Sequence, residues 1–475
     1  DLRRAALSLA AVLIAGALVA GCHREPADPI ARAAANLTTE FRAAYPTEVR
    51  SVGTGPEYAL IAAPTVLPLL DGRSLAVWAY NGQVPGPILR VRVGERLRVE
   101  FTNGLTEDTT VHWHGVRVPN AMDGVPGLTQ EPVHPGESFV YEFVPKDAGT
   151  FWFHPHLGAP EQIERGLVGV LIVEEREPPP YSQDVVWVLD DWLLGKNGAI
   201  DPRFVTPHDL MHDGRWGNVV TVNGRVDTSL AVRPGERIRL RLLNSANGRV
   251  FKPDFAGLDA KVIAVDGMTT ARPLDPDGFE LAPGNRLDLD ITIPPDRAGQ
   301  HVRVVDRFVG DRPNGLGFIR VEGAPVTTPV FPSPAHAYVP KWREALGVPP
   351  ALRFVLNAER GGPFGIAWTL NGVAATGDHA QHHGGHLPLG RFARVRFENA
   401  SFRLHPMHTH GMFFKVLARN DVPVDEPYWR DTTLVHAKET VDVGMVPLDA
   451  GRWMMHCHIL EHAEAGMMTT LDVAP

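Results

Sequence analysis

The feature that most constrains this chain is a sequence pattern that occurs three times. A run of alternating apolar and polar residues ends in asparagine at residues 91–103, 232–244 and 388–399. An Asn-Gly pair precedes each run, and a second alternating run with a nearby turn glycine follows later in each copy. Alternation with period two is typical of half-buried strands, and short strands joined by turns favour β-sandwiches. The sequence therefore predicts an all-β protein built from three related domains.

The length of the chain agrees with this count. Its 475 residues suit three domains of roughly 150 residues each. We expect domain 1 over residues 56–178, domain 2 over 182–323 and domain 3 over 350–475, with proline-bearing linkers between them. The formal net charge is −9 and no long basic run occurs. This balance argues against nucleic acid as a partner.

The N-terminal segment predicts export. Two arginines precede an apolar run, and residues 19–22 read Val-Ala-Gly-Cys, which resembles a bacterial lipobox. We therefore expect residues 1–22 to be a lipoprotein-type export signal and Cys22 to be lipidated. The expected location is the periplasm or cell envelope, as an outer-membrane lipoprotein held by this lipid anchor. A plain cleaved signal or an uncleaved anchor is the alternative. Residues 23–55 are predicted to form a polar tether.

Histidines lie at matched positions in copies one and three. A His-x-His pair begins nine residues after the strand-ending asparagine and another begins five residues after the turn glycine. These positions hold His112, His114, His154, His156, His408, His410, His456 and His458. In copy two they hold Pro253, Phe255, Val304 and Asp306. Residues i and i+2 of a strand share a face, so two facing domains would bring eight imidazoles, which are good copper ligands, to one interface.

Copy three also carries residues for a second metal site. Cys457 lies between the two histidines of the last pair, so its side chain is expected to point away from theirs. His462 and Met467 follow it by five and ten residues, and His405 lies upstream in the same copy. Two histidines, one cysteine and a weak axial methionine form a blue-copper electron-transfer site.

These motifs resemble those of the multicopper oxidases. The resemblance extends from about residue 55 to the last residue. Its motifs read His112-Trp-His, Phe153-His-Pro-His, His405-Pro-Met-His-Thr-His and His456-Cys-His-Ile-Leu-Glu-His-Ala-Glu-Ala-Gly-Met. It implies three cupredoxin-like Greek-key β-sandwich domains and four copper ions as cofactors. It also implies an oxidase activity that passes single electrons from a reducing substrate to O2 and forms two waters.

The resemblance further implies how the ligands divide among the coppers. The type 1 copper takes His405, Cys457, His462 and Met467, and the type 2 copper takes His112 and His408. One type 3 copper takes His114, His154 and His456, and the other takes His156, His410 and His458. The trinuclear cluster of type 2 and type 3 coppers is expected between domains 1 and 3.

Two catalytic roles follow from the resemblance. Cys457 is expected to carry electrons inward, and Asp123 resembles the carboxylate that family members keep near the cluster. A turn-forming aspartate before glycine is the alternative interpretation of Asp123. Many bacterial relatives carry an acid directly after the histidine at position 462. Here that position holds Ala463, with Glu461 and Glu464 nearby, so the sequence does not identify the proton relay.

Copy three contains a histidine-rich insertion that bears on the substrate. The segment between its Asn-Gly pair and Gly390 is longer than in the other copies, and it holds Asp378, His379, His382, His383 and His386. Such tracts bind soft or borderline metals, and the corresponding segment of copper-efflux oxidases contributes to a substrate-metal site. The sequence therefore leaves two hypotheses for the reducing substrate: Cu(I), in the service of copper tolerance, and/or phenolic compounds. A solvated loop is the alternative interpretation.

One alternative lies outside the enzymes. Some cupredoxin-repeat proteins are copper-free and have a structural or cell-division role, but these relatives lose the histidine and cysteine ligands that this chain keeps. A copper nitrite reductase would have two domains and would lack the full set of His-x-His pairs.

Overall fold

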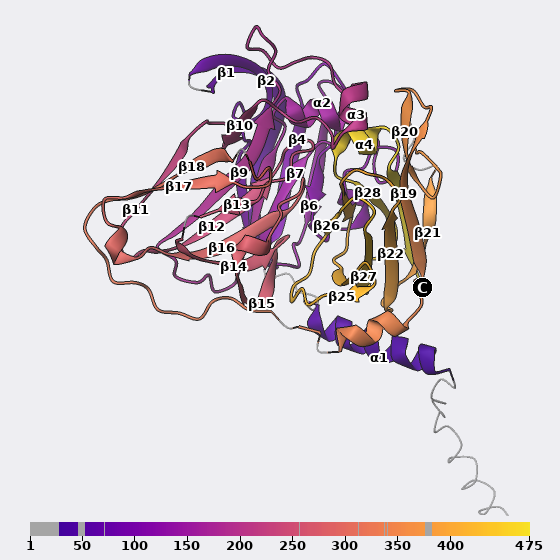
Figure 1. Ribbon diagram of the computed structural model, residues 1–475. Coiled ribbons are helices and arrows are strands. Elements are labelled where there is room, and N and C mark those ends of the chain that lie inside the picture. The colour runs from indigo at the N-terminus through magenta and orange to yellow at the C-terminus, as the bar shows by residue number, and fades with distance from the viewer. Residues whose placement is uncertain are drawn as a thin grey trace, which may run out of the picture.

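The computed structural model describes residues 28–45, 53–70, 72–255, 257–311, 313–336, 338–339, 341–375 and 382–475. Its strands form six sheets that make three pairs, one for each copy of the sequence pattern (Figure 1). The predicted all-β architecture of three sandwich domains is therefore confirmed. The predicted export signal and Cys22 lie outside the described residues.

Domain 1 packs a sheet of order β2-β1-β4-β6 against a sheet of order β3-β8-β7-β5. In β4, Leu97, Val99 and Phe101 are buried and the residues between them are partly or fully exposed, as expected of a strand with one face on the core. The strands are β1 (Thr54–Leu69), β2 (Arg73–Tyr80), β3 (Ile88–Arg92), β4 (Arg96–Asn103), β5 (His112–His114), β6 (Ser138–Phe143), β7 (Gly149–His154) and β8 (Gly169–Glu174).

Domain 2 pairs a sheet of order β10-β9-β12-β16-β14-β15 with one of order β11-β18-β17-β13. β16 is buried along nearly its whole length, because it contacts β7 of domain 1 as well as its own sheet. The strands are β9 (Gln183–Trp192), β10 (Val219–Val222), β11 (Thr228–Val232), β12 (Arg237–Asn244), β13 (Pro253–Asp254), β14 (Asp259–Val265), β15 (Met268–Leu274), β16 (Arg286–Thr292), β17 (His301–Asp306) and β18 (Asn314–Val321).

Domain 3 pairs a sheet of order β20-β19-β22-β27-β24-β25 with one of order β21-β29-β28-β23-β26. Its strands are β19 (Leu352–Arg360), β20 (Ile366–Leu370), β21 (His383–Pro388), β22 (Ala393–Asn399), β23 (His405–Thr409), β24 (Lys415–Arg419), β25 (Val422–Pro423), β26 (Thr432–Val435), β27 (Thr440–Met445), β28 (Gly451–Cys457) and β29 (Met468–Ala474).

The repeated asparagine at the end of β4, β12 and β22 closes the same loop in each domain. The side-chain nitrogens of Asn103, Asn244 and Asn399 donate to two or more backbone carbonyls across that loop, at 2.7–2.8 Å for the closest. Their side-chain oxygens accept the backbone N–H two residues on. Because these bonds satisfy buried polar groups, the loop has nearly one shape in all three domains. In domains 1 and 3 it leads into the first His-x-His strand.

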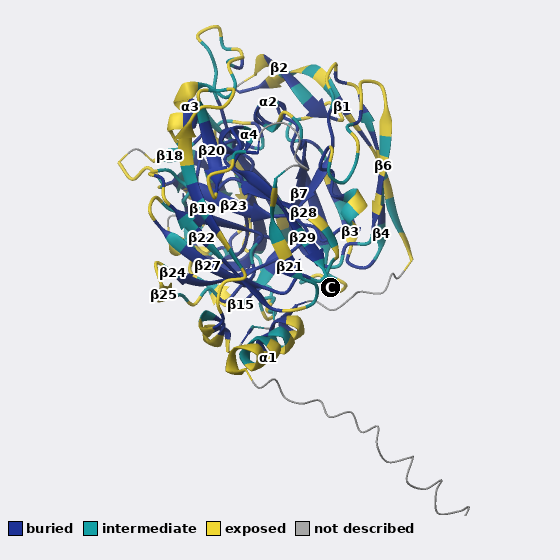
Figure 2. Cartoon of the chain, turned by 90° about the vertical axis from the view of Figure 1, so that its right-hand side faces the viewer, coloured by how far each residue is buried: buried dark blue, intermediate teal, exposed yellow. Residues whose placement is uncertain are grey.

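The predicted tether was wrong at residues 29–44, about half of its length. Residues Pro29–Ala44 form the helix α1, capped by the Asp28 side chain, which accepts from the backbone N–H of Ile30 at 3.0 Å. Leu37, Phe41 and Ala44 are buried at spacings that place them on one helix face. This face packs against domain 3, and the rest of the helix is mostly exposed (Figure 2). Residues 29–44 were interpreted as part of a polar tether because most of their apolar residues are alanines and only Ile30, Leu37 and Phe41 have large apolar side chains.

The other helices are short. They are α2 (Ala159–Glu164), α3 (Pro207–Met211), α4 (Leu460–Glu464) and the 3-10 turns η1 (Asn120–Met122), η2 (Pro276–Gly278), η3 (Pro295–Arg297) and η4 (Trp342–Gly347). α2 of domain 1 and α4 of domain 3 lie side by side (Figure 1). Of the helices in the described ranges, none has both the length and the apolar character needed to cross a membrane.

Candidate metal centres

Each His-x-His strand of domain 1 pairs with the other, and the same holds in domain 3. His112 faces His154 across the β5–β7 ladder, and His408 faces His456 across the β23–β28 ladder. The strand period of two turns both histidines of each pair toward the same side. The two domains therefore present equivalent pairs of imidazoles to the space between them.

The eight imidazoles converge at the interface of domains 1 and 3. All eight side chains are buried, none more than 8% exposed. Rings from the two domains stack: His112 on His410 and His114 on His408, each with centroids 3.8 Å apart. Ligand atoms within 4.8 Å of one another form the groups His112–His114–His154, His112–His408–His410 and His156–His410–His456. The structure thus brings together all eight histidines that the sequence matched.

The structure corrects how the last pair divides. The Nε2 atom of His456 lies 3.2 Å from that of His410, whereas His458 packs against His114 with centroids 4.9 Å apart. The division implied by the resemblance has these two residues exchanged and is wrong. The His-x-His spacing puts both rings on one face, but the docking of the two domains decides which neighbours each ring meets. The observed groups are His156, His410 and His456, and His114, His154 and His458.

The ring nitrogens of the cluster fit a metal. The Nδ1 atoms of His112, His154 and His408 donate to backbone carbonyls at 2.7, 2.8 and 3.0 Å. Their Nε2 atoms are buried and have no hydrogen-bond partner within the described part of the chain, and the same holds for Nδ1 of His114 and both nitrogens of His458. Buried polar atoms without partners are costly. A ring fixed through one nitrogen with the other left open is the usual arrangement of a metal ligand.

The protonation state of these rings agrees with that role. Burial lowers the pKa of His114, His154, His456 and His458 well below the ordinary value for imidazole, and neighbouring imidazoles add to the effect. A buried charged ring loses its hydration, which favours the neutral form. Neutral imidazole is the form that binds a metal ion.

Asp123 lies against this cluster. Its Oδ2 accepts from Nδ1 of His410 at 2.8 Å, and its Oδ1 is 3.4 Å from Nδ1 of His112. Burial alone would raise the pKa of this carboxyl, but the two imidazoles hold it well below its usual range. Gly124 makes the close approach possible, because a Cβ there would lie 1.9 Å from the carbonyl oxygen of Val111. The carboxylate therefore orients two of the candidate ligand rings.

Sequence reasoning missed a second carboxylate and its partner. Asp431 is buried, and its Oδ1 lies 3.2 Å from Nε2 of His114 and 3.3 Å from Nδ1 of His408. Arg286 of domain 2 donates to both oxygens of Asp431, at 3.0 and 2.6 Å, and to the Thr150 carbonyl of domain 1 at 3.1 Å. One arginine thereby ties all three domains together beside the cluster. The single sequence carries no pattern that separates Asp431 from an ordinary aspartate before a strand.

A second, separate group lies inside domain 3. The Nδ1 atoms of His405 and His462 are 3.6 and 4.0 Å from Sγ of Cys457 and 3.3 Å from each other. The Nε2 atoms are held on their far sides by Ser401 Oγ at 2.9 Å and, for His462, by a backbone carbonyl at 2.9 Å. The inner atoms of this predicted type 1 site thus form a triangle of two nitrogens and one sulfur.

Cys457 and Met467 are buried in the same apolar core. The backbone N–H of Cys457 donates to the Met467 carbonyl at 3.0 Å, so the two residues are close neighbours. Burial raises the pKa of the Cys457 thiol. A bound cation reverses this preference, because a coordinating thiol loses its proton.

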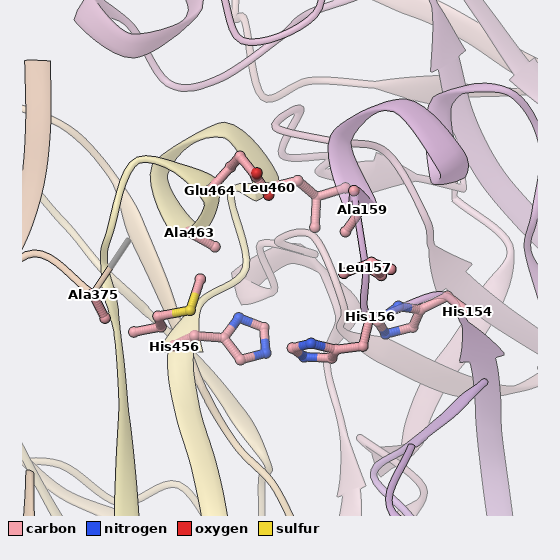
Figure 3. Close-up of a pocket in the computed structure, with 11 residues that line it drawn as sticks. His154, His156, Leu157, Ala159, Ala375, His456, Leu460, Ala463 and Glu464 are labelled. Atoms are coloured by element: carbon pink, nitrogen blue, oxygen red, sulfur yellow. The ribbon is translucent and has the colours of Figure 1, made fainter. Parts of the chain in front are cut away.

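A cavity of about 270 Å³ leads to the cluster. His154, His156 and His456 line its inner end, and Ala463 and Glu464 line the other side (Figure 3). The side chain of Glu464 is partly exposed, so the cavity connects the imidazoles with the surface. A small molecule such as dioxygen can reach the cluster this way.

The two acids beside Ala463 have different surroundings. Glu464 faces this cavity, and burial raises its pKa. Glu461 is directed toward domain 2, where its carboxylate accepts from the Asn247 side chain at 2.8 Å and the Arg215 backbone N–H at 3.0 Å. Glu461 is therefore held in an interdomain contact.

The histidine-rich tract is only partly described. Asp378 and His379 lie outside the described residues. His382 donates through Nδ1 to a backbone carbonyl of β29 at 2.8 Å, and His383 and His386 are exposed on β21. Among the described residues no three histidine, cysteine or acidic ligands gather here. Metal binding by this tract stays a prediction.

Comparisons with known proteins agree with these sites. Sequence profiles of the multicopper oxidases match residues 64–178, 183–324 and 347–475. The solved structure of a multicopper oxidase from Pseudomonas thermotolerans is 35% identical, with a TM-score of 0.77, and the match covers 89% of this chain and 100% of that one.

Two curated relatives add to this. The multicopper oxidase MmcO of Mycobacterium tuberculosis is 28% identical over 98% of this chain and 95% of its own length. Copper resistance protein A of Escherichia coli is 32% identical, over 50% of this chain and 46% of that protein. The first relative matches essentially the whole chain, and the second matches about half of it.

Proposed function

Because this chain belongs to the multicopper oxidase family, we propose that it holds four copper ions and couples substrate oxidation to the reduction of dioxygen to water. One observation carries the proposal. Eight buried imidazoles surround one space, and five of them (His112, His114, His154, His408 and His458) have a ring nitrogen without a hydrogen-bond partner among the described residues; a group of two histidines and a cysteine lies beside them. A copper-free structural relative would have no use for such costly open nitrogens.

The ligand sets of the proposal follow the observed grouping. They are His405, Cys457, His462 and Met467 for the type 1 copper, and His112 and His408 for the type 2 copper. For the type 3 pair they are His114, His154 and His458, and His156, His410 and His456.

Copper bound at these sites would supply the one-electron steps that dioxygen reduction needs. The protein connects the two metal sites, orients the ligand rings and shields them from water. Cys457 links the two sites through its backbone, because its neighbours His456 and His458 belong to different groups of the cluster. Asp123 and Asp431 fix the outer faces of the rings. Burial shields the rings from water, and the cavity at Glu464 gives small molecules a path to them.

For the substrate, we propose Cu(I) in the service of copper tolerance, with phenolic compounds as the alternative. The similarity to copper resistance protein A over half of this chain supports a link to copper. The histidine-rich tract supports it as well, because exposed histidines attract soft metal ions. Neither observation excludes phenols, whose oxidation needs only access to the type 1 ligands.

The test of the function combines metal content with turnover. Purified protein loaded with copper should carry about four copper ions per chain, absorb strongly in the visible range and consume one O2 for every four electrons. Steady-state oxidation of Cu(I) and of a phenol, each with and without added Cu(II), ranks the substrates. A fully loaded protein that oxidises neither donor would contradict the proposal.

We further propose that the mature protein begins at a lipidated Cys22 and resides at the outer membrane. Residues 19–22 support this because they match a lipobox, and more than one acyl chain gives stable membrane anchoring. Mass spectrometry of the membrane fraction should find an acylated N-terminal cysteine. An unmodified N-terminus beyond residue 22 in the soluble periplasm would refute the proposal.

A further inference from the structure

A second cavity lies on the far side of the predicted type 1 site. It measures about 360 Å³, and its lining includes His208, His212, Asp213 and Trp216 of domain 2. It adjoins His462, because Nε2 of that ring donates to the backbone carbonyl of His212 at 2.9 Å. One nitrogen of His462 thus faces Cys457 and the other faces the segment that forms this cavity.

Residues 208–212, which contribute to this cavity, include side chains that bind soft metal ions. His208 and His212 lie four residues apart at α3, and their Nδ1 atoms are 2.9 Å from each other. Met211, three residues after His208, is 50% exposed. Residues three and four apart on a helix are neighbours on its surface. The two imidazoles line the cavity, and the exposed thioether of Met211, which does not line it, lies one helical turn from His208.

We propose that His208, Met211 and His212 form the binding site for a cuprous substrate ion. The inference rests on the proposed oxidase function and names the place where its substrate binds. Thioether and imidazole ligands select Cu(I) over the harder divalent cations. Asp213, which also lines the cavity, adds a carboxylate that favours a cation at its mouth.

The position of the site explains how the electron leaves. An ion held by His212 is separated from the type 1 ligands by the His212 backbone and one hydrogen bond to His462. Each bound Cu(I) loses one electron and departs as Cu(II). Four such electrons, with four protons, reduce one O2 to two waters at the cluster, so the reaction balances. The described part of the histidine-rich tract has no comparable contact, since His382 bonds to the backbone of β29.

Ag(I) provides a binding test that is independent of turnover, because it resembles Cu(I) but does not give up an electron. The variant combines His208→Ala, Met211→Ala and His212→Ala, which keeps the backbone carbonyl that holds His462. Calorimetric titration of the copper-loaded protein should show one fewer Ag(I) bound by the variant. The control is His301→Ala, which removes an exposed histidine of β17 in the same domain.

Kinetics provide the second readout. The ratio of kcat/KM for Cu(I) to kcat/KM for a phenol should fall at least tenfold in the variant, mainly through KM, with the visible spectrum retained. Unchanged Ag(I) stoichiometry, or an unchanged ratio, would overturn the site. So would a tenfold fall confined to the variant with His379, His382, His383 and His386 all changed to alanine. Failure of the proposed function looks different, because loaded wild-type protein would then oxidise neither donor.

Discussion

The three domains share one pair of neighbouring strands, and the residues that pair across it differ. His112 pairs with His154 in domain 1, and His408 pairs with His456 in domain 3. In domain 2 the corresponding strands pair Pro253 with Asp306, so their register is shifted by two residues relative to domains 1 and 3. The backbone therefore sets up the same pair of neighbouring strands in every copy. The residues on these strands and the register in which they pair decide whether the pair of strands can bind a metal.

Domain 2 uses the same strands for its own stability. Phe255 occupies the position of the second histidine of the first pair, and Val304 occupies the position of the first histidine of the second pair. Both are buried in the apolar core of domain 2. Asp306 accepts the backbone N–H groups of Lys252 and Phe308 at 2.8 and 2.9 Å. The domain contributes to the cluster from elsewhere, through Arg286. Domains 1 and 3 therefore supply the candidate metal ligands, and domain 2, which has the same fold, supplies an arginine that supports them.

The largest effect is expected at the sulfur ligand of domain 3. Cys457→Ser should abolish the strong visible absorption and lower oxidase activity at least about 1000-fold, roughly 4 kcal/mol in barrier, because the hydroxyl cannot replace a thiolate. Visible spectra and oxygen uptake measure both. Met407→Leu, a volume-conserving change directly across the ladder from Cys457, is the matched control. A blue, active Cys457→Ser protein would refute the type 1 assignment.

The second-largest effect on activity is expected at the pair of His408 and His456 in domain 3. His408→Ala should remove about one copper per chain and slow oxygen uptake at least about 100-fold, roughly 2.7 kcal/mol, since two groups of the cluster lose their shared ring. Pro253→Ala changes the residue of domain 2 at the sequence position that matches His408, and it should leave copper content and rate as in the wild type. Equal losses of copper in the two variants, measured by elemental analysis, would remove the distinction between the two positions.

Much of this comparison could be predicted from the sequence, because it depends on local periodicity. The strand-ending Asn103, Asn244 and Asn399 fixed the alignment of the copies, and the His-x-His spacing fixed which rings share a face. The exchange of His456 and His458 could not be foreseen, since it depends on how two separate domains dock.

Other features could not be predicted from the sequence for similar reasons. Arg286 and Asp431 meet only because domains 2 and 3 contact each other across 145 residues of chain, and no spacing rule connects them. The helix α1 was missed because only Leu37, Phe41 and Ala44 of its residues are buried, so its apolar face is narrow. Its stability comes from packing against domain 3 rather than from its own composition.

The supporting arginine is expected to have an intermediate effect. Arg286→Ala and Arg394→Ala each break a buried ion pair, with Asp431 and Asp442 respectively, and each should lower the free energy of unfolding by about 3–5 kcal/mol. Only Arg286→Ala should also lower copper affinity or activity, by roughly 10–100-fold. If Arg286→Ala does not fold, Asp431→Asn tests the same contact. Equal copper affinity in the arginine variants and the wild type would contradict the role of Arg286.

The smallest effect on activity is expected at α1, whose ring contacts with domain 3 involve none of the candidate ligands. Phe41 is fully buried and meets Phe392 and Trp429 edge to face, with centroids 4.9 and 5.5 Å away. Phe41→Ala leaves a cavity there and should lower the free energy of unfolding by about 3–5 kcal/mol, measured by denaturant titration of the copper-loaded protein.

The oxidation rate per bound copper should stay as in the wild type, because Phe41 contacts no residue of the metal centres. Ile30→Ala, at a 46% exposed position of the same helix, is the control and should change stability by no more than about 0.5 kcal/mol. If Phe41→Ala instead lost copper as readily as Arg286→Ala, the helix would have to support the cluster through domain 3. Residues that support the metal centres would then occur in the N-terminal segment as well as in the three repeats.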